Sequence, residues 1–359
     1  MKKIVLTGGG TAGHVTPNIA LLPALQAAGY EIAYVGSYEG IEKKLIADFN
    51  IPYTGISTGK FRRYLDPKNF SDPFRVMKGF VEARNYLKNY QPDVVFSKGG
   101  FVSVPVVRAA ATLKIPCIIH ESDMTPGLAN KLCIPVAEKV CCNFPETMKN
   151  IPADKAVLTG SPIRAELAQG SRLAGLNMCG FTANKPVIMV IGGSLGAANV
   201  NKAVRDALPK LLEDFQVVHL CGKDKIDNLL LNTPGYKQFE YIKAELKDIF
   251  AMADVVISRA GANAICELLA LKKPNILIPL PAASSRGDQL LNAASFEAQG
   301  YSIVLNEDDI TTNLLVDKVH ELYFNRQNYV EAMSRSHQMD AINTIMLLIN
   351  EAANKSHTQ

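Results

Sequence analysis

The feature that most constrains this chain is a strand, glycine loop and helix that occur in this order twice, about half a chain apart. The run Lys3–Thr7 leads into Gly8-Gly9-Gly10-Thr11-Ala12-Gly13, and a helical pattern follows from Pro17. Near the midpoint, Val187–Ile191 leads into the glycine loop 192–197, again followed by a helical pattern. Each segment is typical of the opening of a doubly wound domain. The duplication therefore predicts two Rossmann-like domains.

The rest of the chain has the alternation that such domains need. Short β-branched runs bounded by Gly or Pro alternate with amphipathic segments of helical length, which predicts parallel sheets with crossover helices. Gly and Pro within 159–162 mark the join, so we expect domains over 1–160 and 161–338, with 339–359 forming an apolar helix that packs back on the first domain. The predicted strands are Lys3–Thr7, Glu31–Gly36, Val94–Ser97, Cys117–His120 and Val140–Cys142, then Val187–Ile191, Gln216–Cys221, Val255–Ser258, Asn275–Pro279 and Ser302–Leu305.

Composition excludes several other classes of protein. The 359 residues are 48% hydrophobic and 20% charged, which excludes a disordered chain. The seven cysteines form no C-x-x-C pair and most stand beside apolar neighbours, which indicates buried, reduced thiols. The apolar start at 4–6 is too short for a signal peptide, and the longest apolar stretch, 99–119, is interrupted by Arg108, Lys114 and two prolines. We therefore expect a cytoplasmic protein without a membrane span.

The first glycine loop has the spacing of a diphosphate-binding turn, Gly8-x-Gly10-x-x-Gly13. Glycines let a backbone approach a diphosphate, and the following helix offers N–H groups at its positive end. A dinucleotide site also requires an acid at the end of the second strand, and that strand ends without one, which disfavours NAD. A tight turn without a ligand is the alternative. His14 follows the last glycine, where an imidazole would act as a general base or merely cap the turn.

A second candidate site lies downstream of the midpoint. The segment Ser258–Glu267 follows a strand and opens a helix, and its glycine and N–H groups suit a phosphate. Glu267, one turn into the helix, would accept hydrogen bonds from two ribose hydroxyls, or would only complement the helix dipole. Asp288, Gln289 and Asn292 are spaced to offer polar groups to sugar hydroxyls from one rim of a helix, although alone they form an ordinary polar helix start.

Two more polar loops, Ser97–Phe101 and His120–Asp123, follow predicted strands. Doubly wound sheets place their ligands at such strand ends. Acidic pairs that hold metals are sparse, because no D-x-D occurs and Glu307-Asp308-Asp309 has the composition of a solvated loop. Helix N-termini would then carry the phosphate charge, so we predict no obligatory metal and no other cofactor.

Taken together and in order, these motifs resemble the MurG family of glycosyltransferases over nearly the whole chain. The resemblance implies the GT-B fold, an α/β architecture of two Rossmann-like, doubly wound parallel-sheet domains that face each other across a cleft. It also implies an inverting transfer of N-acetylglucosamine (GlcNAc) from UDP-GlcNAc to the 4-hydroxyl of N-acetylmuramic acid (MurNAc) in undecaprenyl-diphosphate-MurNAc-pentapeptide (lipid I). The product is lipid II, a precursor of peptidoglycan that serves cell shape and division. The motifs that carry the resemblance are 8–17, His120–Asp123, 192–197, Gly261, Glu267, Asp288, Gln289 and Asn292.

The same resemblance assigns roles to single residues. His14 would be the catalytic base, with Glu121 in reserve. Substrate contacts from the first domain and the join would be Thr11, Ala12, Gly13, Asp123 and Arg164. Those of the second domain would be Ser194 for phosphate, Ile242 for uracil, Ala262, Asn263, Ala264, Ile265 and Cys266 as loop contacts, Glu267 for the ribose, and Gln289 and Asn292 for GlcNAc. The chain departs from the family pattern at Asp123, Ala264 and Phe101, where Asn, Thr and Tyr are common.

Two alternative functions share these motifs. Another GT-B UDP-sugar transferase with a lipid acceptor would look much the same, because lipid acceptors leave few local signatures; a UDP-GlcNAc 2-epimerase is a more distant alternative. A nucleotide-binding regulator without catalysis is the second alternative, and the presence of His14 together with Glu267 and Gln289 argues against it.

The distribution of charge predicts a peripheral membrane surface. Residues 1–160 carry 19 basic and 13 acidic side chains, whereas 161–359 carry 19 and 21. Within 60–90, eight basic and three acidic side chains are interleaved with apolar ones. Basic groups attract anionic headgroups and aromatic rings insert at the interface, although a solvated helix face would have a similar pattern. The predicted membrane contacts are Arg62, Arg63, Phe74, Arg75, Met77, Lys78 and Phe80. The expected partners are UDP-GlcNAc, lipid I and the cytoplasmic membrane surface, with other cell-wall synthesis proteins as further candidates and no nucleic acid.

Overall fold

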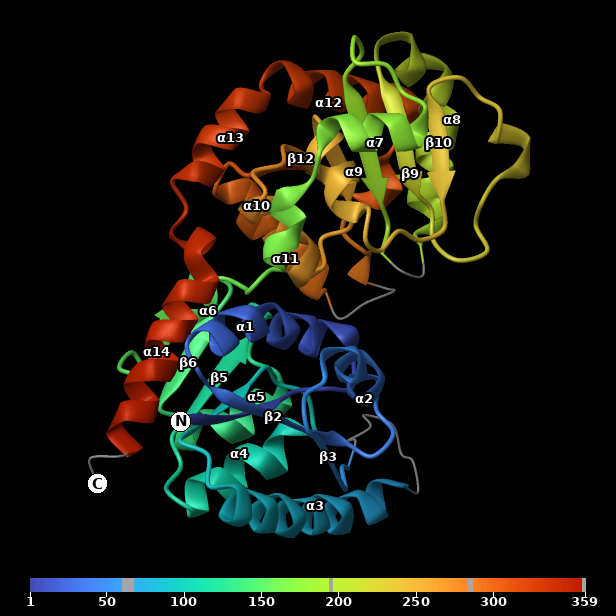
Figure 1. Ribbon diagram of the computed structural model, residues 1–359. Helices are drawn as coiled ribbons and strands as arrows, with labels where there is room; N and C mark the ends of the chain where they lie inside the picture. The colour runs from blue at the N-terminus through green and yellow to red at the C-terminus, as the bar shows by residue number, and fades with distance from the viewer. Residues whose placement is uncertain (60–67, 194–195, 283–286, 357–359) are drawn as a thin grey trace. The chain divides into compact units, whose positions relative to one another are not determined.

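The computed structural model in Figure 1 describes residues 1–59, 68–193, 196–282 and 287–356. The chain forms two compact units, of which unit 1 comprises Met1–Arg164 and Asp340–Gln359 and unit 2 comprises Ala165–Met339. Unit 1 is thus built from two separate stretches of sequence, and unit 2 from one.

Unit 1 is a seven-stranded parallel sheet in the order β3-β2-β1-β4-β5-β6-β7. The interior strand β1 pairs with β2 on one side and with β4 on the other, so that Val5 lies between Ala33 and Val95. The order changes direction between β1 and β4, and ligands of doubly wound sheets bind beyond the carboxyl ends of the strands at such a point. The strands are β1 (Lys3–Thr7), β2 (Glu31–Ser37), β3 (Tyr53–Ile56), β4 (Val94–Ser97), β5 (Cys117–Glu121), β6 (Lys139–Cys142) and β7 (Ala156–Leu158).

Helices cover both faces of this sheet (Figure 1). One face packs against α3 and α4 through residues such as Leu87 and Val106, and the other against α1 and α14 through Leu21 and Ile349. Burial on both faces explains why the central strands are continuous apolar runs. The helices of unit 1 are α1 (Thr16–Ala27), α2 (Ile41–Ile46), α3 (Lys68–Tyr90), α4 (Ser103–Thr112), α5 (Leu128–Cys133), α6 (Pro145–Met148) and α14 (Ala341–Ser356), with the short helices η1 (Ala12–His14), η2 (Ala47–Phe49) and η3 (Ile134–Val136).

The terminal helix α14 belongs to unit 1. Its Ile345 and Ile349 are fully buried in the same core as α1. At its periphery, the hydroxyl of Tyr30 donates to Asn350 at 2.8 Å and the ammonium of Lys355 pairs with Glu138 at 2.5 Å. The helix therefore completes one face of the sheet.

Unit 2 repeats the architecture with a six-stranded parallel sheet in the order β10-β9-β8-β11-β12-β13. The order changes direction between β8 and β11, in the same way as between β1 and β4. Its strands are β8 (Val187–Ile191), β9 (Gln216–Leu220), β10 (Tyr236–Phe239), β11 (Val255–Ser258), β12 (Asn275–Leu277) and β13 (Ser302–Val304). Its helices are α7 (Arg172–Cys179), α8 (Ala198–Asp214), α9 (Leu246–Met252), α10 (Ala262–Ala270), α11 (Asp288–Ala298), α12 (Thr312–Phe324) and α13 (Arg326–Ser334), with η4 (Ala165–Gln169), η5 (Asn228–Leu230), η7 (Glu307–Asp309) and η8 (His337–Asp340).

These sheets confirm the predicted α/β class with parallel strands. All ten predicted strands form, with ends that move by at most a few residues. Strands β3, β7 and β10 were not predicted, because they are short, lie at or beside an edge and contain half-buried or polar residues such as Thr54 and Lys237. All seven cysteines are buried thiols, as predicted.

Candidate active site

Two glycine turns meet at the carboxyl ends of β1 and β4. The N–H of Gly9 donates to the carbonyl of Gly99 at 3.3 Å. Gly100 has a φ of +84°, and a Cβ there would overlap the carbonyl oxygen of Gly9 and lie 3.2 Å from Nδ1 of His14. A side chain at position 100 would therefore separate the two turns. Because Gly100 has none, the His14 ring fits between them.

His14 ends the short helix η1 and points its Nδ1 back at the turn. Nδ1 lies 3.0 Å from the carbonyl oxygen of Gly9 and 3.2 Å from Oγ1 of Thr11. A carbonyl can only accept, so Nδ1 carries the proton and Nε2 has the lone pair. Burial of the ring, with a smaller contribution from the charge of Lys98, lowers the pKa of His14 to about 4. The imidazole is thus neutral at pH 7 and can accept a proton at Nε2.

Lys98, for which no role was predicted, lies beside this site. It follows β4, is only 1% exposed, and its ammonium donates to the hydroxyl of Ser122. This contact ties the loop after β4 to the loop after β5. The charge also acts on His120, since burial first and Lys98 second keep the pKa of His120 well below its ordinary value.

Glu121 is held by its own loop. One carboxylate oxygen accepts from the N–H of Asp123 at 2.9 Å, and the other accepts from the N–H of Gly127 at 3.1 Å and from the side-chain amide of Asn130 at 2.9 Å. The carbonyl of Asp123 in turn accepts from Oγ1 of Thr147. The carboxylate therefore shapes the loop 121–127, and His14 has the better geometry for a base.

In unit 2, the segment predicted to make loop contacts is the start of a helix. Helix α10 begins at Ala262 directly after Gly261, and its first intrahelical bond runs from the N–H of Ile265 to the carbonyl of Gly261. The residues Ala262, Asn263, Ala264, Ile265 and Cys266 therefore form the first part of the helix that this segment was predicted to open. Because the side chains of Ile265 and Cys266 are buried in the core, only their backbone can face a ligand. Glu267 is half-buried one turn further on.

Helix α11 brings Gln289 and Asn292 against the same edge, but not as the predicted rim. The side-chain oxygen of Gln289 accepts from the N–H of Leu280 at 3.0 Å. Asn292 is 2% exposed and donates to the carbonyl of Ala260 at 3.0 Å, so its side chain supports the loop before α10 instead of facing outward. Helix periodicity alone did not indicate that this polar position points inward.

Arg259 and Glu307 were missed by the sequence analysis. Their ion pair is largely shielded from solvent, and Arg259 also donates to the carbonyls of Ile278 and Pro279 at 3.0 and 3.2 Å. This arrangement ties the loop after β11 to those after β12 and β13. The prediction of a solvated loop is thus wrong for Glu307, because a buried guanidinium needs a counter-charge.

The remaining predicted contacts lie elsewhere in their units. Ile242 is buried ahead of α9, so only its backbone could reach a ligand, and its contact with uracil stays a prediction. Arg164 is half-buried at the end of the first stretch of unit 1. Ser194 lies outside the described residues. Among those described, no three His, Cys, Asp or Glu side chains are grouped to hold a metal ion.

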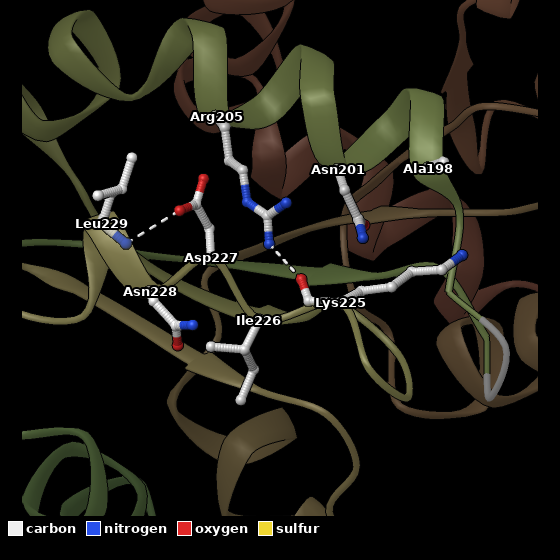
Figure 2. A pocket seen from close by; sticks show the side chains of 8 residues that line it. All are labelled: Ala198, Asn201, Arg205, Lys225, Ile226, Asp227, Asn228 and Leu229. Carbon is white, nitrogen blue, oxygen red and sulfur yellow. Dashed lines mark hydrogen bonds between the residues drawn. The ribbon is translucent and has the colours of Figure 1, made fainter.

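A pocket of about 580 Å³ opens in unit 2 but is lined by none of the predicted site residues (Figure 2). It lies between the first half of α8 and the segment after β9. Inside it the guanidinium of Arg205 donates to the carbonyl of Lys225 at 2.6 Å, and the carboxylate of Asp227 accepts from the N–H of Leu229. These bonds shape the segment itself, and we do not assign the pocket to substrate. Its lining residues are Ala198, Asn201, Arg205, Lys225, Ile226, Asp227, Asn228 and Leu229.

The predicted membrane surface is present in part on α3. Phe74 and Met77 are 78% and 65% exposed, and Arg75 and Lys78 are exposed beside them. Phe80 differs from the prediction, since it is half-buried and packs against the core beneath α3. Arg62 and Arg63 lie outside the described residues. Within the described part of the chain, no helix combines the length and apolar character needed to cross a bilayer.

Comparison with known proteins places the chain in a class. Residues 4–142 match the glycosyltransferase family 28 N-terminal domain, and residues 187–346 match the glycosyltransferase family 28 C-terminal domain. The chain therefore belongs to glycosyltransferase family 28.

Individual relatives show which family within this class the chain belongs to. Over 351 residues, 98% of this chain and 99% of the relative, the chain is 64% identical to the UDP-N-acetylglucosamine--N-acetylmuramyl-(pentapeptide) pyrophosphoryl-undecaprenol N-acetylglucosamine transferase of Lachnoclostridium phytofermentans. It is 57% identical, with the same coverage, to the protein of that name from Clostridium botulinum. The crystal structure of Acinetobacter baumannii MurG superposes with a TM-score of 0.77 at 29% identity, over 98% of this chain and 100% of that one. Within the class, the chain is a member of the MurG family and has its GT-B fold.

Proposed function

We propose that this chain transfers GlcNAc from UDP-GlcNAc to the 4-hydroxyl of MurNAc in lipid I and so forms lipid II. The observation that carries the proposal is the 64% identity to a relative with that transferase name, over 98% of this chain. Identity over that length includes both units, and therefore the parts that would bind acceptor and donor alike.

The reaction is a single displacement with inversion. The 4-oxygen of MurNAc forms a bond to C1 of GlcNAc while the bond from C1 to the diphosphate oxygen of UDP breaks. The hydroxyl proton moves to Nε2 of His14, and the electron pair of the broken bond leaves with UDP. The Nδ1–H bond to Gly9 and the neutral state of the ring support this role, because they leave the Nε2 lone pair available.

The donor would be held mainly by unit 2. The start of α10 offers N–H groups and the positive end of a helix to the diphosphate, together with Ser194 of the glycine loop. Glu267, one turn later, would accept from the ribose hydroxyls. The amide of Gln289 would donate to GlcNAc.

We further propose that no metal ion is required. The developing charge on UDP would be stabilised by helix N-termini, as at other phosphate sites. Unchanged turnover in excess EDTA is expected, and turnover that is lost in EDTA and restored by Mg²⁺ would contradict this part of the proposal.

Unit 1 would contact the cytoplasmic face of the membrane through α3. The lipid-linked acceptor would reside in that face of the membrane. Exposed Phe74 and Met77 would insert between headgroups, and Arg75 and Lys78 would attract anionic lipids. The binding site for the acceptor and the membrane-docking surface would then belong to the same unit.

The decisive experiment is a donor and acceptor panel with purified protein. UDP release and the linkage of the product are measured with UDP-GlcNAc and a lipid I analogue. A GlcNAc joined to the 4-oxygen of MurNAc supports the proposal. Turnover only with a different lipid acceptor favours the alternative transferase, and the absence of UDP release from a folded protein overturns an enzymatic role.

A further inference from the structure

The carboxylate of Glu42, on α2, is fully buried against the glycine turn that carries His14. Its Oε2 accepts from the N–H of Gly10 at 3.1 Å. Its Oε1 accepts from the N–H of Ser37 at 3.0 Å and from the Ser37 hydroxyl at 2.5 Å. Since both oxygens accept and all three partners donate, the contacts fit an ionised carboxylate.

Three glycines make room for this carboxylate. A Cβ at Gly9 would lie 2.5 Å from Cδ of Glu42, and a Cβ at Gly36 would lie 2.8 Å from its Cγ. A Cβ at Gly40 would overlap its Oε1. Gly9, which lies in the first glycine loop but is not one of the glycines of the Gly8-x-Gly10-x-x-Gly13 spacing, is therefore required by a side chain of this protein.

A single peptide group connects Glu42 to His14. The carbonyl of Gly9 and the N–H of Gly10 belong to one planar amide. Its N–H donates to Glu42, and its carbonyl oxygen accepts from Nδ1 of His14 at 3.0 Å. A negative charge on the N–H side polarises the amide and makes its carbonyl a stronger acceptor. The order is carboxylate, amide and imidazole, whereas a serine protease triad places the carboxylate directly on the imidazole.

We propose that Glu42 is a positioning residue for His14 and acts through the Gly9–Gly10 peptide group. It fixes the turn, holds the imidazole in the Nδ1–H tautomer and strengthens Nε2 as a proton acceptor. The catalytic part of this inference rests on the proposed function, since it assumes that Nε2 receives the acceptor's proton.

The charges around His14 act in opposite senses. Burial of the ring and the positive charge of Lys98, from the loop after β4, lower the pKa of His14. The bond to Gly9 and the charge of Glu42, from α2, raise it. Glu42 therefore restores part of the basicity that burial removes from the His14 ring. The effect of burial on the pKa is larger, so the ring stays neutral at physiological pH.

Two substitutions separate charge from geometry. Glu42→Gln removes the charge and keeps the shape and an accepting oxygen for Gly10, with its NH₂ group toward the N–H and hydroxyl of Ser37, whereas Glu42→Ala removes both the charge and the shape. Loss of an orienting group behind a catalytic imidazole costs on the order of tenfold to a thousandfold or more in turnover. We expect kcat to fall about tenfold in Glu42→Gln and about a hundredfold in Glu42→Ala, with KM for UDP-GlcNAc nearly unchanged. Glu39→Gln, an exposed acid three residues away, is the matched control and should retain wild-type turnover.

A second measurement does not depend on activity. The ¹⁵N shifts of the His14 ring at pH 7.5 report its tautomer in the free enzyme. We expect the Nδ1–H form in the wild type and Glu42→Gln, and a mixture of tautomers in Glu42→Ala, with circular dichroism to show that each variant is folded. A folded Glu42→Ala protein with an unchanged tautomer, or with wild-type kcat, overturns the proposal. If the wild type releases no UDP, the proposed function fails while the tautomer measurement still tests the contact.

Discussion

Arg259 and Glu307 form an ion pair in unit 2 whose side chains are only 12% and 7% exposed. Removing one partner leaves the other charge buried, which costs about 3–5 kcal/mol. We expect Glu307→Ala to lower the free energy of unfolding by about 3 kcal/mol in a denaturant titration. Asp308→Asn, at an exposed neighbour in η7, is the control and should change it by less than about 0.5 kcal/mol. Equal effects in the two variants would contradict a structural role for the pair.

The lowered pKa of His14 predicts an unusual pH dependence. A general base must be neutral, so kcat/KM should fall as the pH drops through the pKa of the free enzyme, which is about 4 and not the ordinary 6.5. Activity should therefore persist at pH 5.5, with an acid limb close to pH 4. The measurement is kcat/KM against pH, with recovery of activity after return to pH 7.5 as a control for unfolding. A reversible limb near 6.5 would exclude the half-buried imidazole of His14 as the base.

The same shift predicts how stability changes with pH. Below pH 6.5 the unfolded chain binds a proton at His14 that the folded chain does not bind until about pH 4, so the free energy of unfolding decreases as the pH falls through this window. His219, whose pKa burial lowers to about 3, adds to the same trend. Denaturant titrations of the wild type and His219→Gln between pH 7 and 4.5 test this. The variant should lose less stability on acidification, and equal slopes would contradict it.

Substitutions of His14 and Glu267 should change different kinetic constants. Loss of a general base typically reduces turnover by about 10²- to 10⁴-fold. We expect His14→Ala to lower kcat by about that factor with little change in KM for UDP-GlcNAc. Glu267→Ala should mainly raise that KM, because the carboxylate would bind the ribose in both ground and transition states. A His14→Ala enzyme with near-normal kcat would exclude His14 as the base.

Glu121→Gln tests whether that carboxylate shapes its loop. A glutamine presents an NH₂ group where the carboxylate now accepts from the donors of Asp123, Gly127 and Asn130. Misplacing one buried donor costs about 1–3 kcal/mol. We expect lower thermal stability and a higher KM for the acceptor, with the acid limb of the pH profile unmoved. A shifted acid limb at unchanged stability would instead indicate that Glu121 carries the proton.

The surface of α3 predicts lipid binding. Replacing Phe74 and Met77 with Ser should reduce binding to anionic vesicles by at least about tenfold, since each burial of such a side chain contributes about 1.5–3 kcal/mol. Sedimentation with vesicles at low salt measures this. The control is Phe324→Ser on α12, which is 74% exposed and lies in unit 2. Equal binding of the double variant and the wild type would exclude this docking surface.

Most of the sheet framework could be predicted from sequence, because strands buried on both faces must be continuous apolar runs such as Ile4–Leu6 and Val187–Ile191. Strands β3, β7 and β10 carry no such signal, since they lie at or beside an edge and tolerate polar residues. Boundaries also differed, since β5 runs one residue beyond its predicted end, to Glu121, and β12 ends two residues before its predicted end, at Leu277.

The site was predictable only where it is local in sequence. His14 stands beside the glycine turn that positions it, so the pattern revealed it. Glu42 reaches Gly10 from 32 residues away, and Arg259 reaches Glu307 across unit 2. No spacing rule connects such pairs, because the sheet brings them together. Phe80 and Asn292 were placed outward for a related reason, since neither charge nor helical periodicity indicates which neighbour will cover a given face.

Unit 1 is built from two stretches of chain, and this affects the order in which the two units can fold during translation. Residues 340–356 follow all of unit 2, and they supply the helix that covers Leu21 and Ile4. While unit 2 is being synthesised, α1 is the only one of the two helices of that sheet face already made, so the part that α14 will cover is still exposed. Unit 2, a contiguous stretch, can close first, so the half that leaves the ribosome earlier is expected to reach its native state later and to be the one that needs protection by chaperones.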